Sequence, residues 1–199
     1  MKLVLAGSIG VLVLGSLLCA QDVPVGGWIE RPFAEGGRVQ LDLSSAEYLV
    51  RAGGNDQVRV RWTPADDARA QDLRALSVDV RVSGTQATVV TDGPAKHVRF
   101  VIEIPARSDV RLRVRAGDVT LEGIEGHKDI RMTAGDLKIH VRPESLATAH
   151  ASVTFGDLDA KALGISKSGI KRTIDWIGAG TYALDARLGA GDLTLSETP

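Results

Sequence analysis

The sequence predicts an all-β protein: a β-solenoid-like stack of short strands with Gly-Asp corners, preceded by a β-rich N-terminal module with one short helix. Three observations favour this fold. Apolar and polar residues alternate in many short runs, the dipeptide Gly-Asp recurs before such runs in the second half, and 22 of the 199 residues are Gly. Alternation with a period of two is typical of strands that bury one face, and Gly permits the positive φ values of tight corners.

The N-terminal module, residues 27–105, carries the alternating runs. In "RVQLDL" (38–43), Val39, Leu41 and Leu43 share one face, and "QVRVRW", "LSVDVRVSG", "QATVVTD" and "HVRFVIEIP" repeat the pattern. The opposite faces carry Arg and Asp, so one side of each strand is expected to meet water. Such strands are expected to be antiparallel or to lie at sheet edges.

One helix is predicted within this module, at residues 64–76 of "TPADDARAQDLRAL". Thr63 is a candidate N-cap, and Pro64 suits the first helical position. Asp66 and Asp67 fall in the first turn, where their charge opposes the positive end of the helix dipole.

The second module, residues 106–199, contains the repeat. Its predicted corners are Gly117-Asp118, Gly135-Asp136, Gly156-Asp157 and Gly191-Asp192, with a degenerate fifth copy in which Thr181 follows Gly180. The successive intervals of 18, 21 and 35 residues predict coils of about 20 residues, each stacked on the next. We expect Gly to take a positive φ and Asp to fold its carboxylate onto nearby backbone N–H groups as an Asx turn.

Stacked coils bury the apolar face that one coil cannot bury alone. The residues expected to point inward are Val119, Leu121, Leu137, Ile139, Leu158, Ala160, Leu193 and Leu195. Those between them are expected to point outward: Thr120, Lys138, Asp159 and Thr194. The long last interval interrupts the repeat, although the alternation of Ile174 and Trp176 with polar neighbours indicates a strand there.

The N-terminus has the pattern of a secretory signal peptide at residues 1–20. Lys2 precedes an apolar run over residues 3–18, and Leu18-Cys19-Ala20 offers a cleavage site before Gln21. Two alternatives remain open, a retained membrane anchor and lipidation of Cys19. Because Cys19 is the only Cys, the cleaved chain would contain neither a disulfide nor a thiolate site.

The composition argues against several kinds of partner. The formal net charge is −1 at pH 7 with no strongly basic half, so nucleic acid is not an expected partner. Aromatic residues make up only 4%, which argues against a sugar-binding groove lined with rings. A membrane contact is expected only if the N-terminal segment is retained or Cys19 is lipidated.

We expect no catalytic, cofactor-binding or metal site. The four histidines lack metal-ligand spacing, and Gly-Asp pairs about 20 residues apart are too sparse for a calcium-binding solenoid. Ser168 and Lys171 match Ser-x-x-Lys without its companion motifs. A polysaccharide-cleaving solenoid would need clustered carboxylates, which a column of corner aspartates could supply.

Two stretches resemble a known family. "VRFVIEIPARSDVRLRVRAGDVTLEGIEG" (98–126) and "ISKSGIKRTIDWIGAGTYALDARLGAGDLTL" (165–195) are similar to the core and the ending of the putative adhesin family of bacterial envelope proteins. This is a domain of unknown function grouped with the toast-rack β-solenoids, and the likeness covers most of residues 35–198. It implies a secreted or envelope-anchored β-solenoid, and the family offers no catalytic or binding residues to transfer to this sequence. Some toast-rack relatives are linked to sensing envelope stress.

The expected function is therefore adhesin-like binding or scaffolding of an unidentified envelope or surface component by a non-enzymatic, exported protein. Its expected location is the periplasm, the cell surface or the medium. Two alternatives stay open. One is a sensory module that reports envelope stress to a membrane partner, and the other is an enzyme that acts on polysaccharides.

Overall fold

The structure, a computed structural model, describes residues 26–54, 56–64, 75–93, 97–167 and 170–198. It is all-β, as predicted, with two short 3-10 helices among fifteen strands. The strands are β1 (Gly27–Pro32), β2 (Arg38–Leu43), β3 (Ala46–Gly53), β4 (Gln57–Pro64), β5 (Ser77–Ser83), β6 (Gln86–Asp92), β7 (Val98–Pro105), β8 (Asp109–Glu122), β9 (Lys128–Val141), β10 (Leu146–Phe155), β11 (Leu158–Ala160), β12 (Ile165–Lys167), β13 (Ile170–Ile177), β14 (Tyr182–Ala190) and β15 (Leu193–Glu197). The helices are η1 (Pro143–Ser145) and η2 (Lys161–Leu163).

Two predictions fall mainly outside the described residues. The signal peptide at 1–20 lies wholly outside them, as do residues 65–74 of the helix expected at 64–76. Pro64, the expected first helical residue, is instead the last residue of β4, which extends two residues beyond the alternating run that ends at Trp62.

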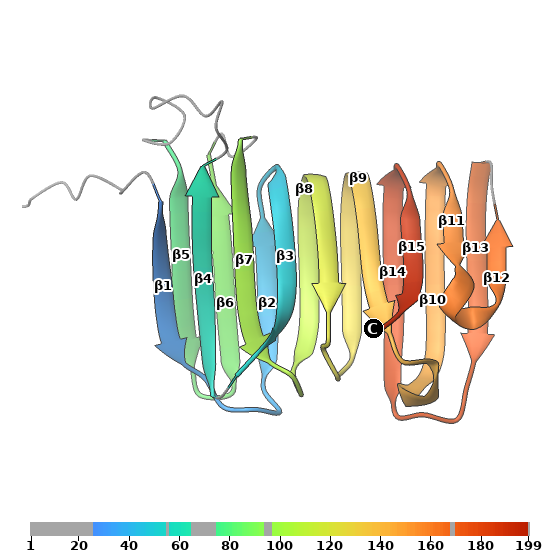
Figure 1. Ribbon diagram of the computed structural model, residues 1–199, viewed down its shortest axis with the longest axis horizontal. Helices are drawn as coiled ribbons and strands as arrows, with labels where there is room; N and C mark the ends of the chain where they lie inside the picture. Colours follow the sequence, from blue (N-terminus) through green and yellow to red (C-terminus); the bar gives the residue numbers. More distant parts are fainter. Residues whose placement is uncertain (1–25, 55, 65–74, 94–96, 168–169, 199) are drawn as a thin grey trace, which may run out of the picture.

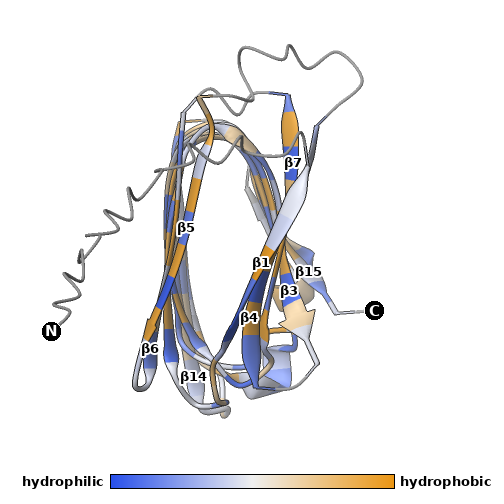
Figure 2. Cartoon of the chain, turned by 90° about the vertical axis from the view of Figure 1, so that its left-hand side faces the viewer, coloured by the Kyte–Doolittle hydropathy of each residue, from blue (hydrophilic) through white to orange (hydrophobic). Residues whose placement is uncertain are grey.

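The strands form two layers around one core (Figure 2). Layer A contains β5, β6, β2, the first halves of β8 and β9, then β14, β10 and β13. Layer B contains β1, β4, β7, β3, the second halves of β8 and β9, then β15, β11 and β12. Figure 1 shows this order along the long axis, from β1 and β5 at one end to β12 and β13 at the other. The sheet is not closed, because in the described part of the chain each of these four strands pairs with a single neighbour.

The long strands β8 and β9 connect the layers. Asp109–Val114 of β8 pair with β2, whereas Gly117–Glu122 pair with β3. β9 lies parallel to β8 with an offset of 18 residues, from Val110 opposite Lys128 to Leu121 opposite Ile139. This offset equals the interval between the first two Gly-Asp pairs, so those pairs lie side by side.

The predicted alternation places the core correctly. Val39, Leu41 and Leu43 are buried, and so are all eight residues that were expected to point inward from the corners. The predicted module boundary at residue 105 falls between β7 and β8, yet β3 pairs with both strands and a single apolar cluster extends across the boundary. None of the helices among the described residues is long and apolar enough to cross a membrane.

The expectation of antiparallel or edge strands in the N-terminal module is wrong for β2 and β3, which have only parallel neighbours. β1, β4 and β7 are antiparallel neighbours, as are β5 and β6. In contrast, β2 is parallel to β6 and β8, and β3 is parallel to β7 and β8. The reason is that β2 lies in layer A and β3 in layer B. The chain passes through the other layer before it returns to pair with either strand, so the returning strand runs in the same direction.

The expectation that coils stack in chain order is also wrong. β14 lies between β9 and β10 and is parallel to both, and β15 lies between β9 and β11. The spatial order of the Gly-Asp pairs is therefore 117, 135, 191 and 156. β13 turns back antiparallel along the outer edge of β10, which leaves the inner edge of β10 for the last part of the chain.

Candidate functional site

The four Gly-Asp pairs form one column at the bend between the layers. Gly117, Gly135, Gly156 and Gly191 have φ values of +117°, +112°, +131° and +122°. A Cβ atom at Gly135 would lie 1.9 Å from the carbonyl oxygen of Gly117, and one at Gly191 would lie 2.0 Å from that of Gly135. These glycines are therefore required by close backbone approach as well as by their φ values.

The aspartates of this column bind the neighbouring strand. The Asp157 N–H donates to Oδ1 of Asp192 at 3.1 Å, and the Asp192 N–H donates to Oδ1 of Asp136 at 3.4 Å. These contacts differ from the predicted Asx turn, because each carboxylate reaches the backbone of the adjacent coil. Asp118 lies opposite Asp136 and continues the row of exposed carboxylates.

Gly180 does not belong to the column, contrary to the prediction of a fifth corner. It lies two residues before β14, where its N–H donates to the carbonyl of Leu146 and the N–H of Thr181 donates to that of Ser145. Its φ lies outside the left-handed region, and a Cβ there would lie 2.2 Å from the carbonyl carbon of Ser145. This Gly permits close backbone approach at the opposite end of the strand.

The residues considered for metal or catalytic chemistry are dispersed. Among the described residues no three His, Cys, Asp or Glu side chains gather as a metal site. His150 Nδ1 lies 2.7 Å from Asp175, His140 Nδ1 lies 3.2 Å from Ser196 Oγ, and His127 accepts the Ala183 N–H. Ser168, of the Ser-x-x-Lys match, lies outside the described residues.

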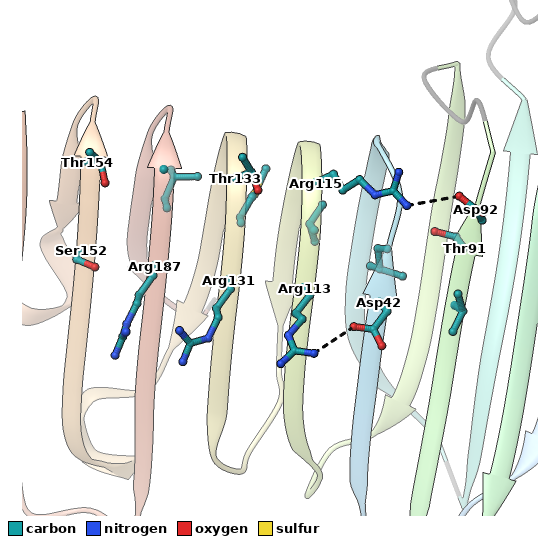
Figure 3. Close-up of a pocket in the computed structure, with 16 residues that line it drawn as sticks. Asp42, Thr91, Asp92, Arg113, Arg115, Arg131, Thr133, Ser152, Thr154 and Arg187 are labelled. Carbon is teal, nitrogen blue, oxygen red and sulfur yellow. Dashed lines mark ion pairs between the residues drawn. The ribbon is translucent and has the colours of Figure 1, made fainter.

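A shallow depression of about 710 Å³ lies on the outer surface of layer A, across β6, β2, β8, β9, β14 and β10 (Figure 3). Its central feature is a row of three arginines: Arg113 on β8, Arg131 on β9 and Arg187 on β14. Arg113 is opposite Arg131, and Arg131 is opposite Arg187. We call these three residues the arginine row.

Each member of the row has an acidic neighbour. Arg187 donates through Nε and Nη2 to Asp185, at 3.0 and 2.9 Å, and these hydrogen bonds raise the pKa of the guanidinium. Arg131 Nε lies 3.2 Å from Asp129. The nearest distance from Arg113 to Asp42 is 4.0 Å. The side chains of the row remain 45–50% exposed, so these ion pairs meet water.

The depression is lined mainly by arginine and hydroxyl side chains. Four guanidinium groups line it, since Arg115 adds to the row, together with the carboxylates of Asp42 and Asp92. Asp129 and Asp185, which pair with Arg131 and Arg187, lie beside it. Hydroxyl groups lie at its other end, on Thr133, Ser152 and Thr154. These groups can bind and orient an anion through hydrogen bonds and charge.

A second depression of about 550 Å³ lies beside the first on the same layer. The strand register aligns Arg111, Asp129, Asp185, His150 and Asp175 across it. Asp129 and Asp185 are adjacent on this line, between Arg111 and His150. These two carboxylates are the partners of Arg131 and Arg187 in the arginine row.

Sequence reasoning missed the arginine row, although a signal for it exists. Aligned on Gly-Asp, the four copies read "RVRAGD", "RMTAGD", "SVTFGD" and "RLGAGD". Arg thus stands four residues before the Gly in three copies, and Ser152 stands there in the fourth. Because the corners stack in register, residues at one offset from the corner form one row on the surface.

Sequence reasoning also missed Lys128, a buried charge in layer A. It occupies the inward side of β9 with Ile130 and Met132, and the residue is 5% exposed. Its Nζ donates to the carbonyl of Gly126 at 3.0 Å. Burial lowers the pKa of Lys128 to about 8, against the opposing attraction of Glu125 and Asp109.

Comparisons with known proteins identify a fold relative. No family model matches the chain. No curated protein matches it either. A crystal structure described as a putative cell adhesion protein from Clostridium sporogenes is similar to it, with a TM-score of 0.53 and 10% sequence identity. The match covers 86% of this chain and 99% of that one, and at this identity it shows a shared fold alone.

Proposed function

We propose that this protein is a non-enzymatic, adhesin-like binding or scaffolding protein, exported to the cell envelope or beyond, and that the outer face of layer A is its binding surface. The observation that carries this proposal is the arginine row, held in register by three parallel strands on an exposed face. The name of the Clostridium sporogenes relative agrees with a role in adhesion.

The fold suits such a role. Parallel pairing at an offset of 18 residues repeats the same backbone from β8 to β9, and we propose that this repetition makes the chain a β-solenoid of the toast-rack type. In such a stack, side chains at one offset recur at a fixed interval along the surface. A repeating surface suits a repeating partner, such as a component of a cell wall or capsule.

The functional groups of the first depression favour binding over turnover. Guanidinium groups stay protonated throughout the physiological pH range, so the arginine row can hold an anion but is poorly suited to exchange protons with it. The corner aspartates lie in a column, as a polysaccharide-cleaving enzyme would need. However, Asp136 and Asp192 accept backbone N–H groups of the next coil, which gives them a structural role.

The proposal is tested with purified, fluorescently labelled chain added to intact cells of the species that encodes it. We expect saturable binding to the cell surface that unlabelled chain displaces. Heat-unfolded chain is the control and should not displace it. Binding that never saturates would contradict the proposal, as would release of reducing sugar ends from the envelope glycans.

A further inference from the structure

The arginine row repeats positive charge at the spacing of the strands. Neighbouring strands lie about 4.8 Å apart, so the three guanidinium groups recur at about that interval across β8, β9 and β14. Figure 3 shows their side chains extending in the same direction along the sheet. The line continues to Ser152 on β10, which is opposite Arg187.

The row keeps donors available despite its ion pairs. A guanidinium carries five N–H donors, whereas Arg187 uses two of its nitrogens on Asp185 and Arg131 directs Nε toward Asp129. At 4.0 Å, Arg113 is beyond hydrogen-bonding distance of Asp42. Exposed ion pairs of this kind are weak, so a ligand can replace them at little cost.

The geometry points to one class of ligand. We infer that the arginine row binds a linear acidic polysaccharide that lies across the strands with its carboxylates on Arg113, Arg131 and Arg187. This inference rests on the proposed binding function. Arginine pairs with carboxylates through two parallel hydrogen bonds, so guanidinium groups in register across three strands can hold several carboxylates of one chain. The hydroxyl groups of Thr133, Ser152 and Thr154 can then bind sugar hydroxyls beyond the row.

Nucleic acid fits the same surface less well. Single strands are usually held by stacking on aromatic side chains, and no aromatic residue lines the depression. The scarcity of aromatic residues also indicates that sugar units are recognised through charge, with no ring platform.

The experiment measures binding of the full chain to polygalacturonate by isothermal titration calorimetry at low salt. We expect the double variant Arg131→Gln, Arg187→Gln to bind at least about tenfold more weakly, because each change removes a charge-assisted contact. Added salt should weaken binding by the parent protein. The matched control is Arg99→Gln, because Arg99 is an exposed arginine of layer B that is paired with Glu47. It should bind like the parent.

Three results would overturn the inference: no binding of polygalacturonate by the parent, equal affinity of parent and double variant, or tighter binding of polyphosphate or single-stranded DNA. Neutral dextran should not bind. Thermal unfolding of each variant checks that the fold is intact. If the double variant still binds cells as the parent does, the proposed function stands and the acidic polysaccharide is rejected as its ligand.

Discussion

The carbonyl oxygen of Gly117 lies 1.9 Å from the point that a Cβ atom at Gly135 would occupy. The same relationship joins Gly135 to Gly191 and Gly191 to Gly156, each at 2.0 Å. At the bend, the backbones of adjacent coils therefore approach more closely than any side chain permits. The column of glycines sets how the two layers meet.

Gly135→Ala should lower the free energy of unfolding by more than about 3 kcal/mol, because the new Cβ must displace backbone. Gly135→Val should be worse still, since its β-branch adds strain at a positive φ. Chemical denaturation measures both. Gly84→Ala is the control: Gly84 has a φ of +56° and open space around it, so only the φ strain of about 1 kcal/mol applies. Equal losses at the two sites would show that close approach is unimportant.

Asp192→Ala should destabilise the protein by about 1 kcal/mol, because the Asp157 N–H loses its acceptor. Asp192→Asn keeps an acceptor oxygen and removes one charge from a row of carboxylates, so its loss should be smaller. The same order is expected at Asp136. Denaturation curves measured side by side test this, and a larger loss for Asn than for Ala would show that the carboxylate charge itself is needed.

Calcium should leave the melting temperature of the parent protein unchanged, and so should a chelator. The corner carboxylates bind backbone N–H groups, and a bound metal ion would instead stabilise the folded state in proportion to its concentration. Differential scanning calorimetry with and without calcium measures this. A rise of several degrees that disappears in Asp136→Asn would identify the column as a metal array.

Lys128→Met should raise stability at pH 7. Burial lowers the pKa of Lys128 from 10.5 in the unfolded chain to about 8, so below pH 8 the folded state bears a cost of about 3 kcal/mol for holding the charge. Between about pH 8 and 10.5 the unfolded state binds more protons, and this group therefore makes the protein more stable as pH rises. Urea unfolding at pH 7 and about pH 9.5 should show that rise in the parent and a smaller one in Lys128→Met.

The control for this experiment is Lys138→Met, an exposed position on the same strand, which should change stability by less than about 0.5 kcal/mol. If Lys128→Met proves less stable than the parent at pH 7, the hydrogen bond to Gly126 outweighs the cost of burial.

Thr91→Val should destabilise the protein more than Tyr48→Phe. Thr91 Oγ1 accepts the Ser44 N–H at 3.0 Å and lies 2.7 Å from the Tyr48 hydroxyl, all within the core. Its loss leaves buried polar groups unpaired, at about 2–3 kcal/mol, whereas Tyr48→Phe leaves Thr91 bonded to Ser44 and should cost about 1 kcal/mol. Thermal unfolding ranks the two variants. The reverse order would show that the Tyr48 hydroxyl contributes more to stability than Thr91 does.

The sequence predicts which side chains point inward better than it predicts which strands lie side by side. Alternation is a local property, so Val119 and Leu137 could be placed inward from their own runs. The position of Gly191 beside Gly135 could not be deduced, because a Gly-Asp pair specifies a bend and carries no information about which coil lies next to it. For the same reason Gly180 was assigned to a column from which backbone geometry excludes it.

The arginine row could have been found from the sequence, given the assumption that corners stack. Arg113, Arg131 and Arg187 share one offset from Gly-Asp. However, that offset gives a shared row only if the third and fourth copies exchange their order in space. With stacking in chain order, Ser152 would separate Arg131 from Arg187. The continuity of the row is therefore a property of the topology.

The interleaving of β14 and β15 has a consequence for synthesis of the chain. β10 and β13 leave the ribosome before β14, yet among the described strands β10 reaches β9 only through β14. A chain that ended before Tyr182 would retain every residue of β10, β11 and β13 and would lack the strands that attach them. Removal of β14 and β15 should thus release a segment that precedes them in the chain, and these two strands complete the pairing of the described sheet.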